Sequence, residues 1–150
     1  MAYSGRYSVR NKNKYEGDAS RVIFRSLWER QVFKWIDENP SIVKWSSEEV
    51  VIPYRCQTDN RIHRYFIDVK MVMEDGKTYL VEIKPKSQAK PPKTRRKTKK
   101  YLREVMVYAK NESKWKAANE YCADRGWKFL VWTEDHLKEL GIKLLTPLKK

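Results

Sequence analysis

Residues 66–86 read FIDVKMVMEDGKTYLVEIKPK, two strand-like runs joined at a glycine, and this stretch limits the possible fold most strongly. Apolar and polar side chains alternate on both sides of Gly76, as they do on strands with one buried face. Asp68, Glu82 and Lys84 interrupt the pattern at positions where a core favours valine or isoleucine. The stretch therefore predicts an antiparallel hairpin that carries charged side chains on one face.

The length of the turn decides whether Asp68 and Glu82 share a face, because opposed residues in a hairpin have numbers with a constant sum. A two-residue turn at 75–76 would place Asp68 opposite Ile83, and Glu82 would then point away. A three-residue loop at 74–76 places Asp68 opposite Glu82, with their Cβ atoms about 4.5–5.5 Å apart. The glycine stands where this longer loop requires a positive φ, so we expect the three-residue loop or an equivalent bulge.

Two carboxylates this close repel each other at neutral pH, and a divalent cation between them would remove the repulsion. Their oxygen ligands suit Mg²⁺, with Mn²⁺ as a substitute, and these ions also bind phosphate. Lys84 follows Glu82 on the same strand face, where its ammonium group can orient a metal-bound water or stabilise charge on phosphorus. These groups are what hydrolysis of a phosphodiester bond requires. The alternative is an exposed strand face with a glutamate–lysine pair and no site.

A helix is expected over 20–39, with Ser20 as its N-cap and Pro40 beyond its end. Its apolar side chains recur at helical spacing, at Phe24, Leu27, Trp28, Val32, Trp35 and Ile36. Glu29 lies at the border of this stripe and could lean over the sheet to join the metal ligands, directly or through water. A solvated glutamate at the edge of the helix is the alternative.

The order of the elements predicts an α/β fold with an αβββαβ core, in which helices flank a central mixed sheet. After the first helix we expect strands or helices at 50–54, 63–73, 78–84, 101–125, 127–133 and 133–140. The long crossover through a helix predicts that the strands at 78–84 and 127–133 run parallel. We expect one domain over 20–150, preceded by a basic arm at 1–19.

The charge of the chain indicates its partner. Lysine and arginine total 33 against 19 aspartates and glutamates, a net charge of +14, which favours nucleic acid. An exposed loop at 85–100 is expected to contact the DNA backbone without strong base readout, through Lys86, Lys90, Lys93, Arg95, Arg96, Lys97, Lys99 and Lys100. A solvated loop is the alternative. No apolar stretch approaches the length of a bilayer span, so we expect no membrane partner.

Cys56, Cys122, His63 and His136 lack metal-binding spacing, so we expect reduced thiols and structural or surface histidines.

FID at 66–68 and VEIKPK at 81–86, after a helix that carries Glu29, resemble the PD-(D/E)xK, or restriction-endonuclease-like, superfamily. HRYFID at 63–68 and WKAANEYCADRGWKFLVWTED at 115–135 are similar to the N-terminal domain of TnsA-type endonucleases. Over about 20–140 the chain also resembles head completion nucleases of T-even-type bacteriophages. The resemblance implies that Asp68, Glu82 and the Ile83 carbonyl are metal ligands. It further implies that Lys84 is the catalytic lysine and that Glu29 is the acidic residue of the first helix. Ile67 replaces the proline of the motif.

The resemblance further implies a Mg²⁺-dependent endonuclease that cleaves double-stranded DNA or DNA ends with little sequence specificity. It would process DNA ends during phage head completion, after packaging, with phage head or neck components as partners. Its place would be the host cytoplasm, and association with the virion stays open. A non-catalytic DNA-binding protein of a capsid assembly and a transposase subunit are the alternatives. The sequence leaves open whether the protein is a monomer or a homodimer.

Overall fold

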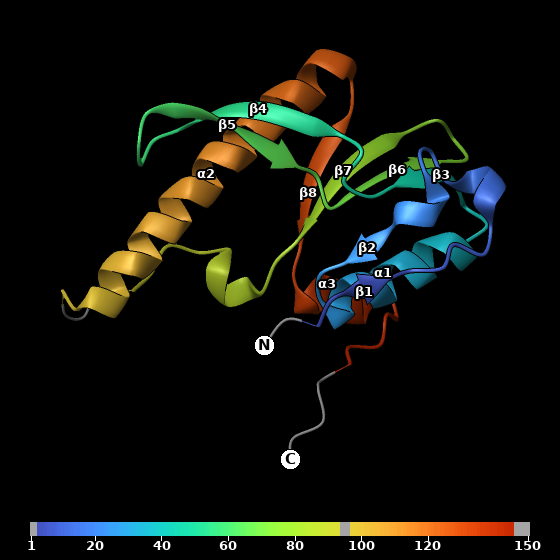
Figure 1. Ribbon diagram of the computed structural model, residues 1–150, viewed down its shortest axis with the longest axis horizontal. Helices are drawn as coiled ribbons and strands as arrows, with labels where there is room; N and C mark the ends of the chain where they lie inside the picture. The colour runs from blue at the N-terminus through green and yellow to red at the C-terminus, as the bar shows by residue number, and fades with distance from the viewer. Residues whose placement is uncertain (1–2, 94–96, 146–150) are drawn as a thin grey trace.

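The computed structural model describes residues 3–93 and 97–145, and its centre is a four-stranded mixed sheet (Figure 1). The strands lie in the order β3-β6-β7-β8 and comprise Ile42–Ser46, Val69–Met73, Thr78–Ile83 and Lys128–Trp132. β3 and β7 pair with β6 antiparallel, whereas β7 and β8 run parallel, as the long crossover predicted. The predicted α/β fold with a central mixed sheet is therefore confirmed. β3 was not predicted from the sequence.

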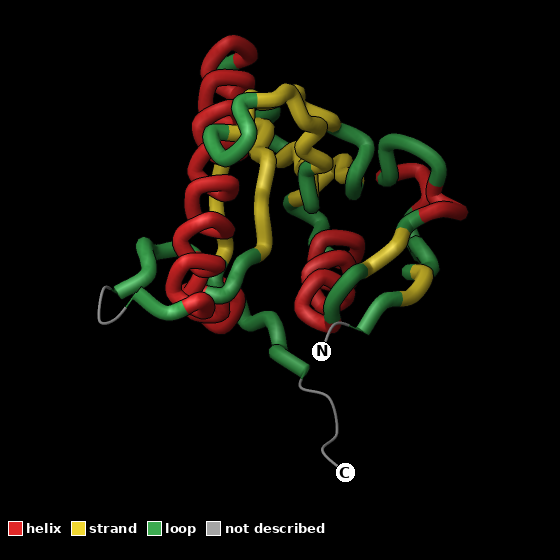
Figure 2. The backbone as a smooth tube through the Cα atoms, turned by 60° about the vertical axis from the view of Figure 1, so that its left-hand side comes forward, coloured by secondary structure: helices red, strands yellow, loops and turns green. Residues whose placement is uncertain are grey.

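The two longer helices cover opposite faces of this sheet (Figure 2). α1, Leu27–Glu38, packs with Val69 and Val81 in one hydrophobic cluster. α2, Lys99–Arg125, is one continuous helix that ends at Gly126 in the left-handed conformation, and it packs on Leu80 in a second cluster. α3, Glu134–Glu139, follows β8 and begins after Thr133, as predicted. No helix in the described part of the chain combines the length and apolar character needed to cross a membrane.

The strand expected over 63–73 is two strands, which belong to different sheets. Within residues 3–93 and 97–145, β5, Arg61–Phe66, pairs only with β4, Val51–Cys56, and this hairpin packs against α2. The chain leaves β5 at Ile67, whose N–H donates to the carbonyl of Val50 and whose carbonyl accepts from the N–H of Glu48. These bonds to the loop before β4 replace a continuous ladder. Asp68 is therefore the residue at which the chain enters the central sheet.

The first helix begins later than its apolar spacing predicted. The chain forms two short 3₁₀ helices, Lys12–Lys14 and Ala19–Arg21, and pairs β1, Gly5–Arg6, with β2, Ile23–Phe24. Ser26, not Ser20, caps α1, by accepting a hydrogen bond from the N–H of Glu29. The expected start was wrong because the apolar residues of β2 pair with the preceding segment instead of extending the helix.

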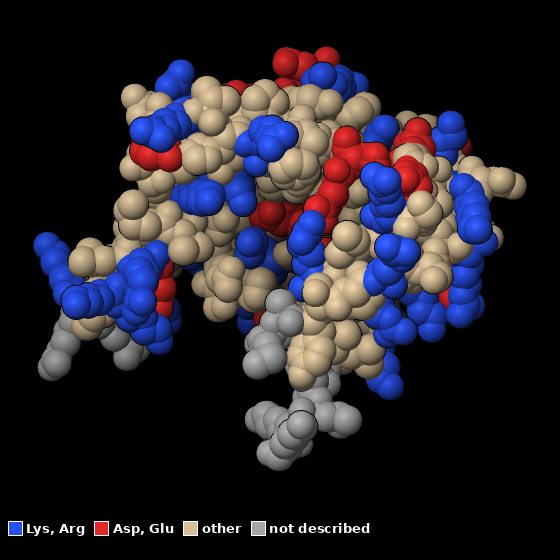
Figure 3. Space-filling view, viewed as in Figure 1, with Lys and Arg blue, Asp and Glu red and all other residues tan. Residues whose placement is uncertain are grey.

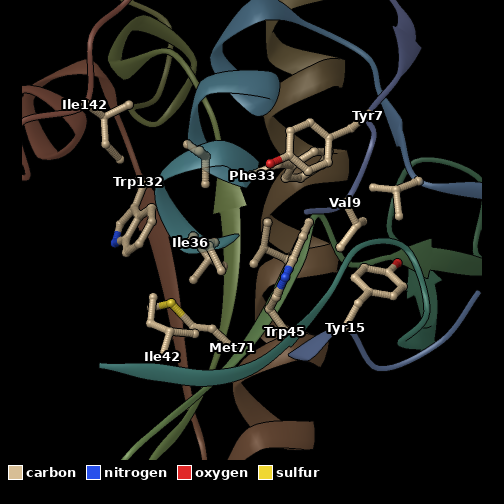
Figure 4. Packing of buried hydrophobic residues seen from close by; sticks show 14 of the residues in the cluster. Tyr7, Val9, Tyr15, Phe33, Ile36, Ile42, Trp45, Met71, Trp132 and Ile142 are labelled. Atoms are coloured by element: carbon tan, nitrogen blue, oxygen red, sulfur yellow. The ribbon is translucent and has the colours of Figure 1, made fainter. Parts of the chain in front are cut away.

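The segment expected as a basic arm is packed against the rest of the molecule. Tyr7, Val9 and Tyr15 belong to the buried cluster, beside Phe33 and Trp45 (Figure 4). Buried Asp37 at the end of α1 ties this segment down, since its carboxylate accepts from the Tyr7 hydroxyl and from the N–H groups of Arg10 and Asn11. Cations of this segment lie at the surface, but its aromatic residues are part of the core.

Candidate active site

The turn between β6 and β7 sets the register of the two strands. Met73 donates its N–H to the carbonyl of Lys77 and accepts from the N–H of Gly76, which has φ = +87°. The three-residue loop at 74–76 is therefore confirmed, and Val69 stands opposite Val81. The same register, extended by one residue, sets Asp68 against Glu82.

The backbone of β7 anchors the carboxylate of Asp68. The N–H of Ile83 donates to Oδ2 of Asp68 at 2.9 Å. Because the N–H and C=O of a strand residue in a hydrogen-bonded position point to the same neighbour, the Ile83 carbonyl is also directed to this side. Among the described residues, Oδ1 of Asp68 has no hydrogen-bond partner. One carboxylate oxygen is thus fixed and the other can accept a ligand.

Two side chains from other elements hold the carboxylate of Glu82, which is only 4% exposed. The buried hydroxyl of Tyr65, on β5, donates to Oε1 at 2.8 Å, and the indole N–H of Trp115, on α2, donates to Oε2. Burial, with the negative charges of Glu82 and Asp68, raises the pKa of Tyr65, so that its hydroxyl keeps the donated proton. Each oxygen of Glu82 retains a lone pair that can accept a further ligand.

Glu29 reaches the same region from the first turn of α1. The N–H of Arg25 donates to its carboxylate at 3.4 Å, and the Arg25 guanidinium binds both oxygens of Glu48, at 2.8 and 2.9 Å. Burial raises the pKa of Glu29 to about 7, the charge of Glu48 acts in the same direction, and the bond from Arg25 opposes it. Glu29 is therefore a half-buried side chain whose charge acts on Asp68, and not a fully solvated one.

The three acidic side chains interact electrostatically. Burial first, then the charges of Glu29 and Glu82, raise the pKa of Asp68 well above its ordinary value. The N–H of Ile83 and the charge of Lys84 act in the opposite direction without cancelling it. This negative charge and a set of carboxylate and carbonyl oxygens are what a hard divalent cation binds, so the residues present fit Mg²⁺ or Mn²⁺.

Two lysines lie beside this acidic cluster. Lys84 follows β7, where its N–H donates to the carbonyl of Trp132 at 2.9 Å and fixes the backbone. Lys114, on α2, is half-buried, with its Nζ 5.3 Å from the centre of the Tyr65 ring. Burial lowers the pKa of Lys114, and the nearby charge of Glu82 opposes this effect. Figure 3 shows carboxylates gathered in a hollow of this face, with lysine and arginine side chains along its borders.

Three residues of this site, Tyr65, Trp115 and Lys114, were not predicted from the sequence as functional residues. Tyr65 and Trp115 lie within the segments that carry the family resemblance, but no spacing in the sequence connects either of them with Glu82. Their contact arises only when the β4–β5 hairpin and α2 pack beside β7.

The predicted DNA-binding cations lie beyond β7 and at the start of α2. Lys86 is engaged within the molecule, since its N–H donates to Glu134 at 2.7 Å and its Nζ lies 3.4 Å from Asp135. Other cations of the loop are exposed, namely Lys90, Lys93, Lys97, Lys99 and Lys100. Arg95 and Arg96 lie outside the described residues.

A different group of possible ligands lies at the tip of the β4–β5 hairpin. The ligand atoms of Cys56, Asp59 and His63 are all within 4.8 Å of one another, and the His63 ring is 2.7 Å from Asp59. A thiolate and an imidazole are typical of zinc and not of magnesium, so this group differs in chemistry from the acidic cluster. His136 helps to cap α3, because its ring accepts from the N–H of Thr133 at the start of this helix.

Two comparisons relate this chain to known proteins. Residues 39–134 match the family described as TnsA-like endonuclease N terminal. The head completion nuclease of Enterobacteria phage T4 is 41% identical over 148 residues, which cover 95% of this chain and 99% of that protein. Asp68, Glu82 and Lys84 lie within the matched 39–134 segment, whereas Glu29 precedes it.

Proposed function

Since this chain belongs to the TnsA-like endonuclease family, we propose that it is a metal-dependent DNA endonuclease. Its likeness to the head completion nuclease of phage T4 supports a role in phage head completion, where it would process DNA ends after packaging. It would act in the host cytoplasm, in contact with head or neck components. The net charge of +14 supports a DNA substrate held mainly through its phosphates.

The observation that carries the proposal is the opposition of Asp68 and Glu82 across β6 and β7, beside Lys84. Mg²⁺, or Mn²⁺ in its place, would be held by Asp68, Glu82 and the Ile83 carbonyl, with Glu29 as a ligand directly or through water. Such a cation, when bound, acts as a Lewis acid toward a phosphate oxygen and toward water.

The protein groups around the cation have separate tasks. Tyr65 and Trp115 keep the Glu82 carboxylate in one orientation, because both of its oxygens accept from buried or half-buried donors. The ammonium group of Lys84 orients the attacking water and stabilises charge that develops on the phosphate. Lys114, half-buried over the ring of Tyr65, adds positive charge on the α2 side of the same site.

Plasmid cleavage tests the proposal. The wild-type protein should nick or linearise supercoiled plasmid in Mg²⁺ and leave it intact in EDTA. Asp68→Ala and Lys84→Ala should abolish cleavage and still bind DNA, since affinity comes from other cations. Lys138→Ala, which removes an exposed cation of α3, is a control that should cut normally.

The same experiment distinguishes the alternative of a non-catalytic DNA-binding protein in a capsid assembly. If the wild-type protein binds plasmid in a salt-dependent manner but leaves it intact with Mg²⁺ and with Mn²⁺, that alternative holds. Cleavage that persists in Asp68→Ala would show that the acidic cluster is not the site. Removing Asp68 should also tighten DNA binding slightly, because its charge repels phosphate in the absence of metal.

A further inference from the structure

A groove of about 430 Å³ lies beside the acidic cluster, between the β4–β5 hairpin and α2. Its lining combines three cations with apolar and aromatic side chains, namely Arg64, Lys110 and Lys114, then Ile62 and Phe66, then Tyr54 and His63. None of these residues belongs to the basic loop at 85–100. The groove is therefore a second cationic surface, and it differs from the loop in containing rings.

Two apolar side chains of this groove, both on β5, are exposed, whereas the ring of Tyr54 is buried. Ile62 is 60% and Phe66 is 42% exposed, and the guanidinium of Arg64, between them on β5, lies 5.5 Å from the centre of the Phe66 ring. These three residues alternate along β5 and so project from the same face. An exposed ring and an isoleucine beside an arginine form a flat surface on which another ring can stack.

The groove meets the acidic cluster at Lys114, which lines it on the α2 side. Phe66 is the last residue of β5 and stands two positions before Asp68. On the α2 wall, Lys114 lies over the ring of Tyr65, whose hydroxyl holds Glu82. The α2 wall of the groove therefore lies next to Glu82.

We propose that this groove binds unpaired nucleotides of the DNA strand next to the bond that is cut. The inference rests on the proposed endonuclease function and gives its substrate class, which is DNA with a single-stranded segment such as an overhang or gap. The cations match successive phosphates, and Phe66 with Ile62 offers a stacking surface for bases. In a duplex, bases already stack on one another and the backbone faces outward, so phosphate contacts alone would leave Ile62 and Phe66 without a partner.

Binding of labelled oligonucleotides in EDTA tests the inference. Phe66→Ala should weaken binding of short oligothymidine by about 5- to 100-fold and change binding of a duplex of equal length by less than about twofold. Phe66→Trp should restore the affinity for oligothymidine. Val43→Ala is the matched control, because Val43 is similarly exposed, at 45%, but lies on β3 outside the groove. Circular dichroism and thermal denaturation verify that each variant is folded.

Equal weakening for both DNA forms, or no change for oligothymidine, overturns the inference. Because the assay contains no metal and needs no cleavage, it remains readable even if the protein cuts no DNA, and so separates this inference from the endonuclease proposal. In Mg²⁺, the wild-type protein should cut a duplex with an overhang faster than a blunt duplex, and Phe66→Ala should lose most of that difference. A wild-type protein that cuts both duplexes equally fast contradicts the assigned substrate class.

Discussion

Replacing Glu29 with glutamine should stabilise the metal-free protein at and above neutral pH. Burial raises the pKa of Glu29 in the folded protein from 4.5 to about 7. The folded state therefore binds this proton more tightly than the unfolded state, and stability falls as the pH rises from about 4.5 to about 7. Glutamine carries no charge at any pH, avoids this loss, and can still accept the bond from the N–H of Arg25.

The size of the effect follows from the rise in pKa. A pKa that rises from 4.5 to about 7 corresponds to about 3 kcal/mol, because each pH unit is worth about 1.4 kcal/mol. Water that reaches the half-buried carboxylate reduces this value. We expect Glu29→Gln to raise the free energy of unfolding by about 1–3 kcal/mol at about pH 8, and to leave it almost unchanged near pH 4.5.

Urea denaturation in EDTA, followed by tryptophan fluorescence, measures this difference. Wild type and Glu29→Gln should be compared at about pH 5 and about pH 8, with Glu139→Gln as the control, because Glu139 is an exposed residue of α3. An equal stability difference at the two pH values would refute the reasoning, as would a Glu29→Gln variant that is less stable than wild type at about pH 8. Adding Mn²⁺ should reduce the difference in unfolding free energy between Glu29→Gln and wild type, since a bound cation stabilises the wild-type carboxylates.

Three further substitutions probe single contacts. Trp115→Phe removes the donor to the Glu82 carboxylate and should weaken Mn²⁺ binding by about tenfold in calorimetry, an effect that Trp127→Phe should not reproduce. Gly76→Ala meets no atom within 4 Å but forces an alanine to φ = +87°; thermal denaturation should show a loss of about 1 kcal/mol, and an unchanged transition would contradict the strain. Asp37→Asn places an amide NH₂ next to the N–H donors of Arg10 and Asn11, so urea denaturation should show a free energy of unfolding lower by about 1–3 kcal/mol. An unchanged free energy of unfolding would mean that packing alone holds the amino-terminal segment.

Patterns within a short stretch of sequence predicted those features of the fold that neighbouring residues determine. The register of β6 and β7 follows from one glycine, because the loop at 74–76 needs a left-handed residue at its last position. The break after β5 had no such signal, since Ile67 leaves the strand to bond with residues 48 and 50. The predicted start of α1 was wrong for a similar reason. The helical spacing of apolar residues continued through β2, but pairing with β1 determines the conformation of β2.

The candidate site also contains some residues that the sequence predicted and others that only tertiary packing brings together. Asp68, Glu82 and Lys84 could be grouped from alternation and turn length alone. The partners of Glu82 could not, because Tyr65 and Trp115 come from a separate hairpin and from α2. The half-buried position of Glu29 also depends on packing, since spacing alone allowed a solvated side chain equally well.

The passage of the chain through Asp68 links the two halves of the molecule. Ile67 packs in the cluster of the β4–β5 hairpin and α2, while Val69, two residues later, packs in the cluster of α1. Tyr65 and Trp115, from the β4–β5 hairpin and α2, orient the carboxylate of Glu82. Glu29 belongs to the other half, on α1. A partly folded chain with only one half assembled therefore lacks a complete acidic cluster.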